Sequence, residues 1–104
     1  MRPWSSMRST QDFRRVYARG KRTKRPGLMV AALPGSTGLV CGLAVRKGAG
    51  TAVDRNRIKR RLRGALDVLP AGLSGTIVVQ ASDAALTIPF QELVGTLRAG
   101  VEAA

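Results

Sequence analysis

The chain has 104 residues, and 18 lysine and arginine side chains against 6 aspartate and glutamate side chains give it a formal net charge of +12. It contains no histidine and one cysteine, which excludes histidine-based acid–base catalysis, a disulfide framework and a thiolate metal cluster. We expect residues 1–104 to form a single domain, and the charge predicts an extended anionic partner.

The N-terminal quarter of the chain is predicted to hold one amphipathic helix between two basic segments. Residues 1–8 are polar and basic, and we expect a flexible N-terminal tail there, with no signal peptide. Ser9 and Asp12 resemble a capping box that opens a short helix, and Gly20 supplies its stop. The apolar stripe of this helix consists of Phe13, Val16 and Tyr17. Residues 21–26 are predicted to form a basic extended connector.

Three short apolar runs predict the strands of a small sheet. Residues 28–33 and 39–45 are separated by residues 34–38, a spacing that predicts a β-hairpin with a five-residue loop. Cys41 lies in the second run, where a buried and inert thiol is expected. Residues 76–80 are rich in β-branched side chains and predict a third, central strand.

Residues 52–69 contain the strongest helical pattern of the chain. At about 100° per residue, one side of this helix is apolar and the rest of its circumference is basic. The apolar sector comprises Ile58, Leu62, Ala65, Leu66 and Leu69. Gly64 within the helix costs roughly 1 kcal/mol relative to alanine, and Pro70 ends the pattern.

A last helix completes the predicted elements. Thr87 is expected to cap it, with Pro89 in the first turn, where proline is tolerated. Its core stripe comprises Phe90, Leu93, Val94, Leu97 and Val101. The order helix, strand, strand, helix, strand, helix predicts an α+β fold in which a small, mostly antiparallel sheet, with room for one extra short strand, packs with three helices.

The basic residues are concentrated in two blocks of the chain. Residues 1–25 and 46–63 together hold 17 of the 18 lysine and arginine side chains. Residues 1–63 carry a net charge of +15, and the remainder carries −3. Because an ordinary solvated surface mixes both signs, this segregation indicates a binding face.

Arg55, Asn56 and Arg57 stand at the entrance of the predicted helix over residues 52–69. Free backbone N–H groups and the helix dipole favour phosphate there, and the asparagine can donate to and accept from a base edge or a ribose hydroxyl. The alternative is a solvated helix face. Only Asp54 and Asp67 are near enough in sequence to neutralise the basic side chains, so we favour nucleic-acid binding.

The two aromatic residues of the first helix have two interpretations. Phe13 and Tyr17 could belong to the core, or they could form stacking platforms for single-stranded nucleic acid, edged by the arginines of the same helix. Both interpretations hold if one edge of each ring packs into the core while one face of the ring stays accessible. Because neither a nucleophile–base pair nor a two-metal carboxylate site is evident, we expect another molecule to carry out any bond-making.

Over residues 7–101 the sequence resembles the protein component of bacterial ribonuclease P. The most specific part is residues 52–63, which contain the Arg-Asn-Arg core, and residues 12–20 and 42–47 support it. Three places depart from the usual pattern. Thr51 replaces an asparagine, Gly64 replaces an acidic or amide residue, and residues 80–82 lack a basic side chain.

The resemblance implies a division of labour between protein and RNA. In that family a large RNA uses Mg²⁺ to remove the 5′ leader of precursor tRNA by hydrolysis. The chain would be the protein subunit of a ribonucleoprotein endoribonuclease, with no catalytic side chain and no organic cofactor. Its partners would be ribonuclease P RNA and precursor tRNA, with no obligate protein partner and no membrane. A left-handed strand–helix–strand crossover is also implied.

The resemblance also assigns residues to two RNA contacts. The single-stranded leader would lie in a cleft between the sheet and the first helix, contacting Phe13, Arg14 and Tyr17. The residues facing the catalytic RNA would be Arg46, Lys47, Arg55, Asn56, Arg57, Lys59, Arg60, Arg61 and Arg63. Whether the protein itself holds a metal ion is left open.

Two other functions fit the size and charge. A ribosomal or RNA-chaperone protein would bind RNA without stimulating cleavage, and a DNA-binding protein would insert residues 52–69 into a groove, although no dimerisation element is evident. The single cysteine and the lack of an apolar run of about 20 residues predict a cytoplasmic location.

Overall fold

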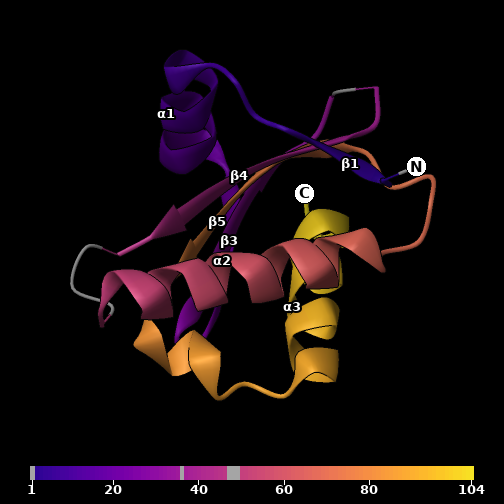
Figure 1. Cartoon of the computed structure of the whole chain (residues 1–104). Coiled ribbons are helices and arrows are strands. Elements are labelled where there is room, and N and C mark those ends of the chain that lie inside the picture. The colour runs from indigo at the N-terminus through magenta and orange to yellow at the C-terminus, as the bar shows by residue number, and fades with distance from the viewer. Residues whose placement is uncertain (1, 36, 47–49) are drawn as a thin grey trace.

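The structure, a computed structural model, describes residues 2–35, 37–46 and 50–104. Its strands form one mixed sheet in the order β1-β4-β5-β3-β2, with helices on both faces (Figure 1). This is the predicted α+β fold, with two strands more than predicted. The sheet is not mostly antiparallel as predicted, because β1–β4 and β4–β5 pair parallel whereas β3–β5 and β2–β3 pair antiparallel. The elements in chain order are β1 (Trp4–Ser6), α1 (Thr10–Arg19), β2 (Lys21–Arg25), β3 (Leu28–Leu33), β4 (Leu39–Val45), α2 (Ala52–Asp67), β5 (Gly75–Ala81), the 3₁₀-helix η1 (Asp83–Leu86) and α3 (Phe90–Glu102).

Strand β5 occupies the centre of the sheet, as predicted for residues 76–80. It pairs antiparallel with β3 and parallel with β4. The predicted hairpin of β3 and β4 is therefore wrong, because β5 lies between them. The reason is that Ile77, Val78 and Val79 are fully buried, so this strand is apolar on both sides and is most stable with a neighbour at each edge.

Helix α2 connects the parallel strands β4 and β5. Viewed from the α2 side with both strands pointing upward, β5 lies to the left of β4 (Figure 1). The crossover therefore has the left-handed sense expected from the resemblance, an exception to the usual right-handed rule.

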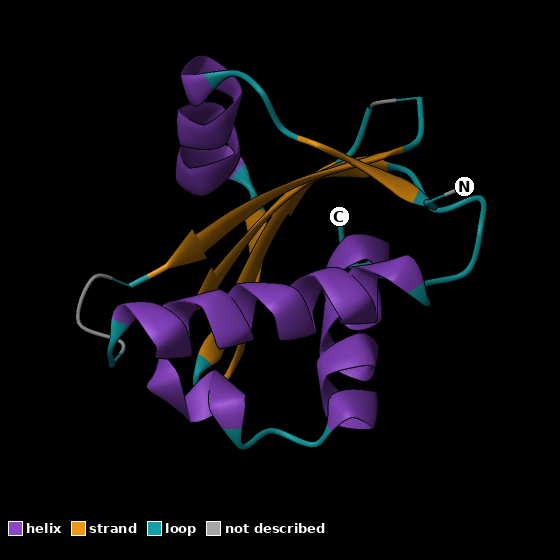
Figure 2. Cartoon of the chain, viewed as in Figure 1, coloured by secondary structure: helices purple, strands orange, loops and turns teal. Residues whose placement is uncertain are grey.

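The sheet divides the core into two unequal parts, because successive side chains point to opposite faces. On one face, covered by α2 and α3, Ile58 and Val79 belong to the larger cluster of buried side chains. On the other face α1 lies alone (Figure 2), and its Val16 packs with Ala31 and Val78. The α1 side thus has much less helical cover than the α2 side.

Helix α1 begins and ends where the sequence predicts. The Ser9 hydroxyl oxygen accepts a hydrogen bond from the backbone N–H of Asp12 at 3.3 Å. Gly20 follows the helix with a φ of −66°, so the helix does not end through a left-handed residue. A Cβ at Gly20 would instead lie 2.5 Å from the carbonyl oxygen of Val16 and 2.9 Å from the nitrogen of Ala32. Glycine is needed there because the helix end packs directly on β3.

The start of α3 differs from the prediction. Thr87 does not cap it but follows η1, and its hydroxyl donates to the carbonyl oxygen of Ala84 at 3.2 Å. Pro89 is the residue before the first helical position. Phe90 is 42% exposed rather than part of the core, because its ring lies against α2 at Gly64. The residues of the predicted stripe that are buried are Leu93, Leu97 and Val101.

Two segments predicted to lack regular structure are strands. Residues 21–26 are not only a connector, because β2 pairs antiparallel with β3 along the sheet edge. Its lysines and arginines keep that edge unattractive to strands of other chains. The flexible tail predicted for residues 1–8 is wrong where the structure describes it, since β1 pairs parallel with β4.

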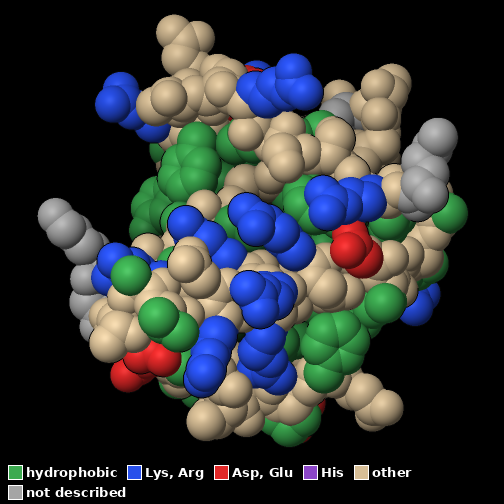
Figure 3. All heavy atoms as spheres, in the orientation of Figure 1, with side chains coloured by type: hydrophobic (Ala, Val, Ile, Leu, Met, Phe, Trp, Pro, Cys, Tyr) green, Lys and Arg blue, Asp and Glu red, His purple; other side chains and the backbone are tan. Residues whose placement is uncertain are grey.

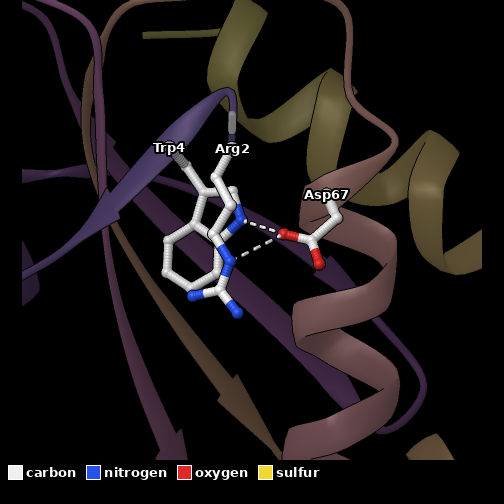
Figure 4. A network of polar contacts seen from close by, with 3 residues as sticks. All are labelled: Arg2, Trp4 and Asp67. Atoms are coloured by element: carbon white, nitrogen blue, oxygen red, sulfur yellow. Dashed lines mark hydrogen bonds and ion pairs between the residues drawn. The ribbon is translucent and has the colours of Figure 1, made fainter.

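A polar contact holds β1 against the end of α2 (Figure 4). Trp4 is 6% exposed, and its indole N–H donates to Oδ1 of Asp67 at 2.8 Å. The Arg2 Nε lies 3.5 Å from the same oxygen, and its guanidinium carbon lies 5.2 Å from the centre of the Trp4 ring. The burial of one large aromatic side chain therefore orders a segment that is otherwise polar. Within the described ranges, no helix combines the length and apolarity needed to cross a membrane.

Candidate nucleic-acid interface

Helix α2 presents a basic face because its apolar face is buried. Ile58, Leu62, Ala65 and Leu66 are fully buried against the rest of the core. The remaining circumference places lysine and arginine side chains outward, and these gather over α2 in the space-filling view (Figure 3). We call this surface the α2 basic face. It comprises Arg55, Asn56, Arg57, Lys59, Arg60 and Arg63, all of which were predicted to bind RNA.

The entrance of α2 is fixed by a complete capping box. The Thr51 hydroxyl oxygen accepts from the backbone N–H of Asp54 at 3.2 Å, and Oδ2 of Asp54 accepts from the backbone N–H of Thr51 at 3.1 Å. Thr51, which departs from the family pattern, therefore serves as a cap. This leaves Asp54 occupied at the helix start rather than paired with the neighbouring arginines.

The charges of the α2 basic face are not neutralised within the part of the chain that the structure describes. The ion pairs found there join Arg2 with Asp67, Arg15 with Asp12, and Arg98 with Glu102. None of them involves a lysine or arginine of the α2 basic face. Closely spaced like charges without counter-ions destabilise one another, so the surface is suited to an anionic partner.

A hollow of about 430 Å³ lies along the α2 basic face. It extends from the second turn of α2 to the end of the helix, where Arg2 and Asp67 meet. The sequence prediction did not include Arg2, because residues 1–8 were expected to be a flexible tail. The hollow is lined by Arg2, Asn56, Lys59, Arg60, Arg63, Gly64 and Asp67.

Arg61 differs from the other predicted RNA-binding residues on α2. Its guanidinium donates hydrogen bonds to the carbonyl oxygens of Ala85 and Ile88, and the side chain is half-buried. These contacts attach the segment around η1 to α2. The planar guanidinium can serve two carbonyls at once, which a lysine ammonium does less well.

The candidate leader site lies on the α1 side of the sheet. The rings of Phe13 and Tyr17 are 6.4 Å apart at an interplanar angle of 11°, and both residues are half-buried. The Tyr17 hydroxyl donates to Oε1 of Gln80 on β5 at 2.9 Å. Arg14, the third predicted residue, is exposed on the same helix. Both rings therefore pack against the smaller core cluster and keep part of their surface accessible.

Two residues of this site were not predicted from the sequence. The Arg22 guanidinium carbon lies 5.0 Å from the centre of the Tyr17 ring, and its terminal nitrogen donates to the Tyr17 carbonyl oxygen at 2.8 Å. Gln80 fixes the other end of the tyrosine. Arg22 was missed because residues 21–26 were interpreted as a connector. In the structure they contain the strand β2, in which alternate side chains point to the same face, here toward α1.

A smaller hollow of about 200 Å³ continues along the sheet toward Arg46. Its lining includes Met29 and Gln80, and Arg46 stands at its rim as an exposed side chain. The backbone N–H of Arg46 donates to the carbonyl oxygen of Ala81 at 3.0 Å, which fixes its position beside β5. Lys47, predicted together with Arg46, lies outside the described residues.

The described residues bring together no group of three or more His, Cys, Asp or Glu side chains able to hold a metal ion. Burial raises the pKa of the Cys41 thiol to about 12, and the side chain is 2% exposed, so the thiol is an inert part of the core, as predicted.

Comparisons with known proteins agree with this description. The family profile described as Ribonuclease P matches residues 1–104. A protein of Rhodococcus jostii (strain RHA1), named ribonuclease P protein component, is 36% identical over 107 residues that cover 91% of this chain and 84% of that protein. A protein of the same name from Herpetosiphon aurantiacus is 47% identical over 60 residues, covering 57% of this chain and 49% of that protein. The RNase P protein of Staphylococcus aureus has the same fold, with a TM-score of 0.74 at 24% identity over 94% of this chain and 93% of that one.

Proposed function

This chain belongs to the ribonuclease P protein family, and on that premise we propose that it is the RNA-binding subunit that assists a catalytic RNA in removing the 5′ leader of precursor tRNA. The observation that carries the proposal is the α2 basic face, whose charges lack counter-ions within the described residues. A phosphate backbone supplies the missing negative charge, and the counter-ions it releases add to the affinity.

The protein uses its two sides for two RNA segments. The α2 basic face, together with Arg46 and Lys47, binds the catalytic RNA. The single-stranded leader lies on the α1 side of the sheet, where bases contact Phe13 and Tyr17, and Arg14 contacts phosphate. The half-buried rings and the fixed Tyr17 hydroxyl support this assignment, because a preorganised platform loses little entropy when a base stacks on it.

Hydrolysis is assigned to the RNA and its Mg²⁺. Within the described ranges, no three His, Cys, Asp or Glu side chains come together in a way that could hold a metal ion. The contribution of the chain is to bind, to orient the leader and to offset phosphate repulsion between the two RNA molecules.

A reconstitution experiment tests the proposal. The purified chain is mixed with a bacterial ribonuclease P RNA and a labelled precursor tRNA at low Mg²⁺, where repulsion between the RNAs is least screened. We expect cleavage at the 5′ end of the mature sequence to accelerate. A ribosomal or RNA-chaperone protein would bind RNA without this acceleration, so an unchanged rate would sink the proposal and favour that second function.

Single substitutions test the division into two sites. Arg57→Ala should weaken binding to the catalytic RNA and reduce the slope of log affinity against log salt by about 0.9. Arg98→Ala is the matched control, because Arg98 is an exposed α3 arginine paired with Glu102 at 2.6 Å, away from the α2 basic face. It should leave both quantities unchanged.

The leader site has its own pair of variants. Tyr17→Ala should spare binding of the catalytic RNA but lower the preference for leader-bearing substrates by about 1–3 kcal/mol. Tyr17→Phe keeps the ring and loses only the hydrogen bond to Gln80, so it should retain most of the preference. If Tyr17→Ala and Arg57→Ala affected both RNAs equally, the two-site description would be wrong.

A further inference from the structure

Phe90 is the most exposed of the four aromatic residues, and neither RNA contact assigned above uses it. It stands at the start of α3, where 42% of its surface is exposed. One edge of its ring faces α2, since a Cβ placed on Gly64 would lie 3.7 Å from its Cε1. Gly64 departs from the family pattern, and a Cβ there would make only an ordinary van der Waals contact with the ring.

The ring borders a hollow of about 500 Å³ between α2, η1 and the start of α3. We call it the Phe90 pocket. Its lining combines two apolar side chains with three guanidinium groups, and no acidic side chain contributes to it. The lining residues are Arg57, Arg60, Arg61, Leu86 and Phe90.

The three arginines of the Phe90 pocket have different tasks. Arg61 holds its shape by donating to the carbonyl oxygens of Ala85 and Ile88, which fixes the η1 segment and Leu86 against α2. Arg57 and Arg60 are exposed and take part in no ion pair among the described residues. Two free positive charges therefore stand beside an apolar wall that carries an accessible aromatic ring.

We propose that the Phe90 pocket binds one unpaired nucleotide of the catalytic RNA, an inference that rests on the proposed function. The base stacks on the ring of Phe90 and contacts Leu86, and the adjoining phosphates pair with Arg57 and Arg60. The nucleotide is unpaired because only a base splayed out of a helix can offer its face to a side chain. The charge favours RNA over an apolar protein segment, which would have to bury both arginines without partners.

Four measurements on substituted proteins test the proposal, each with the full chain and intact ribonuclease P RNA. Phe90→Ala should weaken RNA binding roughly 5- to 150-fold, the range for loss of one base–aromatic stack. The slope of log affinity against log salt should stay unchanged, because no charge is removed. Phe90→Tyr keeps a stacking ring and should bind like the unsubstituted chain. Phe90→Leu keeps the apolar contact with α2 but offers no ring, so it should bind nearly as weakly as Phe90→Ala.

A crosslinking measurement identifies the occupant directly. The photoreactive analogue benzoylphenylalanine, placed at position 90, should crosslink to a single unpaired nucleotide of the RNA. Equal affinity of Phe90→Ala and the unsubstituted chain, or a crosslink only to paired nucleotides, would overturn the proposal. If the unsubstituted chain and Phe90→Leu bound the RNA with equal affinity, Phe90 would serve only as an apolar packing residue. The nucleotide site would then be refuted, and the proposed function would stand. If the unsubstituted chain failed to bind, both would fall.

Discussion

Arg61 and Arg57 lie one helical turn apart on α2, yet the structure predicts opposite consequences for their removal. Arg61→Ala takes charged donors away from two backbone carbonyl oxygens, those of Ala85 and Ile88. A hydrogen bond from a charged group contributes about 1.5–3 kcal/mol, and water can replace part of it at a half-buried site. We therefore expect the free energy of unfolding to fall by about 2–4 kcal/mol for the two bonds together.

Arg57→Ala should change the free energy of unfolding by less than about 0.5 kcal/mol, because the side chain is exposed and in no ion pair among the described residues. Urea denaturation followed by the fluorescence of Trp4, the single tryptophan, measures both variants. With a slope of about 1–3 kcal/mol per molar urea, Arg61→Ala should lower the midpoint by about 1–2 M.

The effect of these substitutions on RNA binding should differ from their effect on the free energy of unfolding. Folded Arg57→Ala should bind the catalytic RNA more weakly and with a shallower salt dependence, as described above. Arg61→Lys keeps a positive charge, but its ammonium serves the two carbonyl oxygens less well than the planar guanidinium does, so it should lose part of this contribution of about 2–4 kcal/mol. Equal urea midpoints for Arg57→Ala and Arg61→Ala would refute the structural role of Arg61.

Three further predictions concern the folded chain. In urea denaturation, Gly100→Ala should be less stable than Gly95→Ala by about 1–3 kcal/mol. A Cβ at Gly100 would lie 2.6 Å from Cγ1 of the buried Val30, whereas no atom lies within 4 Å of a Cβ at Gly95. Equal stability of the two variants would contradict the packing of α3 on β3. Asp67→Ala should lower the free energy of unfolding by about 1–3 kcal/mol, because it leaves the Trp4 indole N–H without its acceptor. Asp67→Asn keeps an oxygen at this position and should lower the free energy of unfolding less. Identical losses for the two variants would show that the hydrogen bond contributes nothing. Burial raises the pKa of Cys41 from 9.0 to about 12, so the unfolded chain loses its thiol proton first as pH rises. The contribution of the buried thiol to stability should therefore be complete below pH 9.0 and decline above it by up to about 1.4 kcal/mol per pH unit. Thermal melts should show a steeper alkaline decline for the native chain than for Cys41→Ala, and parallel declines would contradict this prediction.

Local sequence pattern was sufficient to locate the helices and most of the side chains they bury. The period of α2 correctly separated Ile58 and Leu62 from the basic side chains, because both the apolar face and the charged face repeat at the helical spacing. The capping pattern at Ser9 likewise located the start of α1. These features depend on residues three or four positions apart, which the sequence displays directly.

Pairing between distant segments was not predictable in the same way. The run at residues 28–33 and the run at residues 39–45 looked like a hairpin because they are adjacent in sequence, but the more apolar β5 separates them. Trp4 and Asp67 are 63 positions apart, so nothing local indicated that residues 4–6 would form a strand. Phe90 matched a core stripe by its spacing, and only the packing of its ring against α2 places it at the surface.

The position of β5 in the sheet has a consequence for how the chain acquires its structure during synthesis. The central strand is the last strand to be made, and both of its neighbours precede α2 in the chain. Until residues 75–81 leave the ribosome, β3 and β4 each have an unpaired inner edge, and no early sheet can close around them. Such late, non-local pairing slows folding and leaves strand edges open to aggregation. The residues of α2 also leave the ribosome before that moment, so the apolar face of the helix has no complete sheet to pack against until β5 is made.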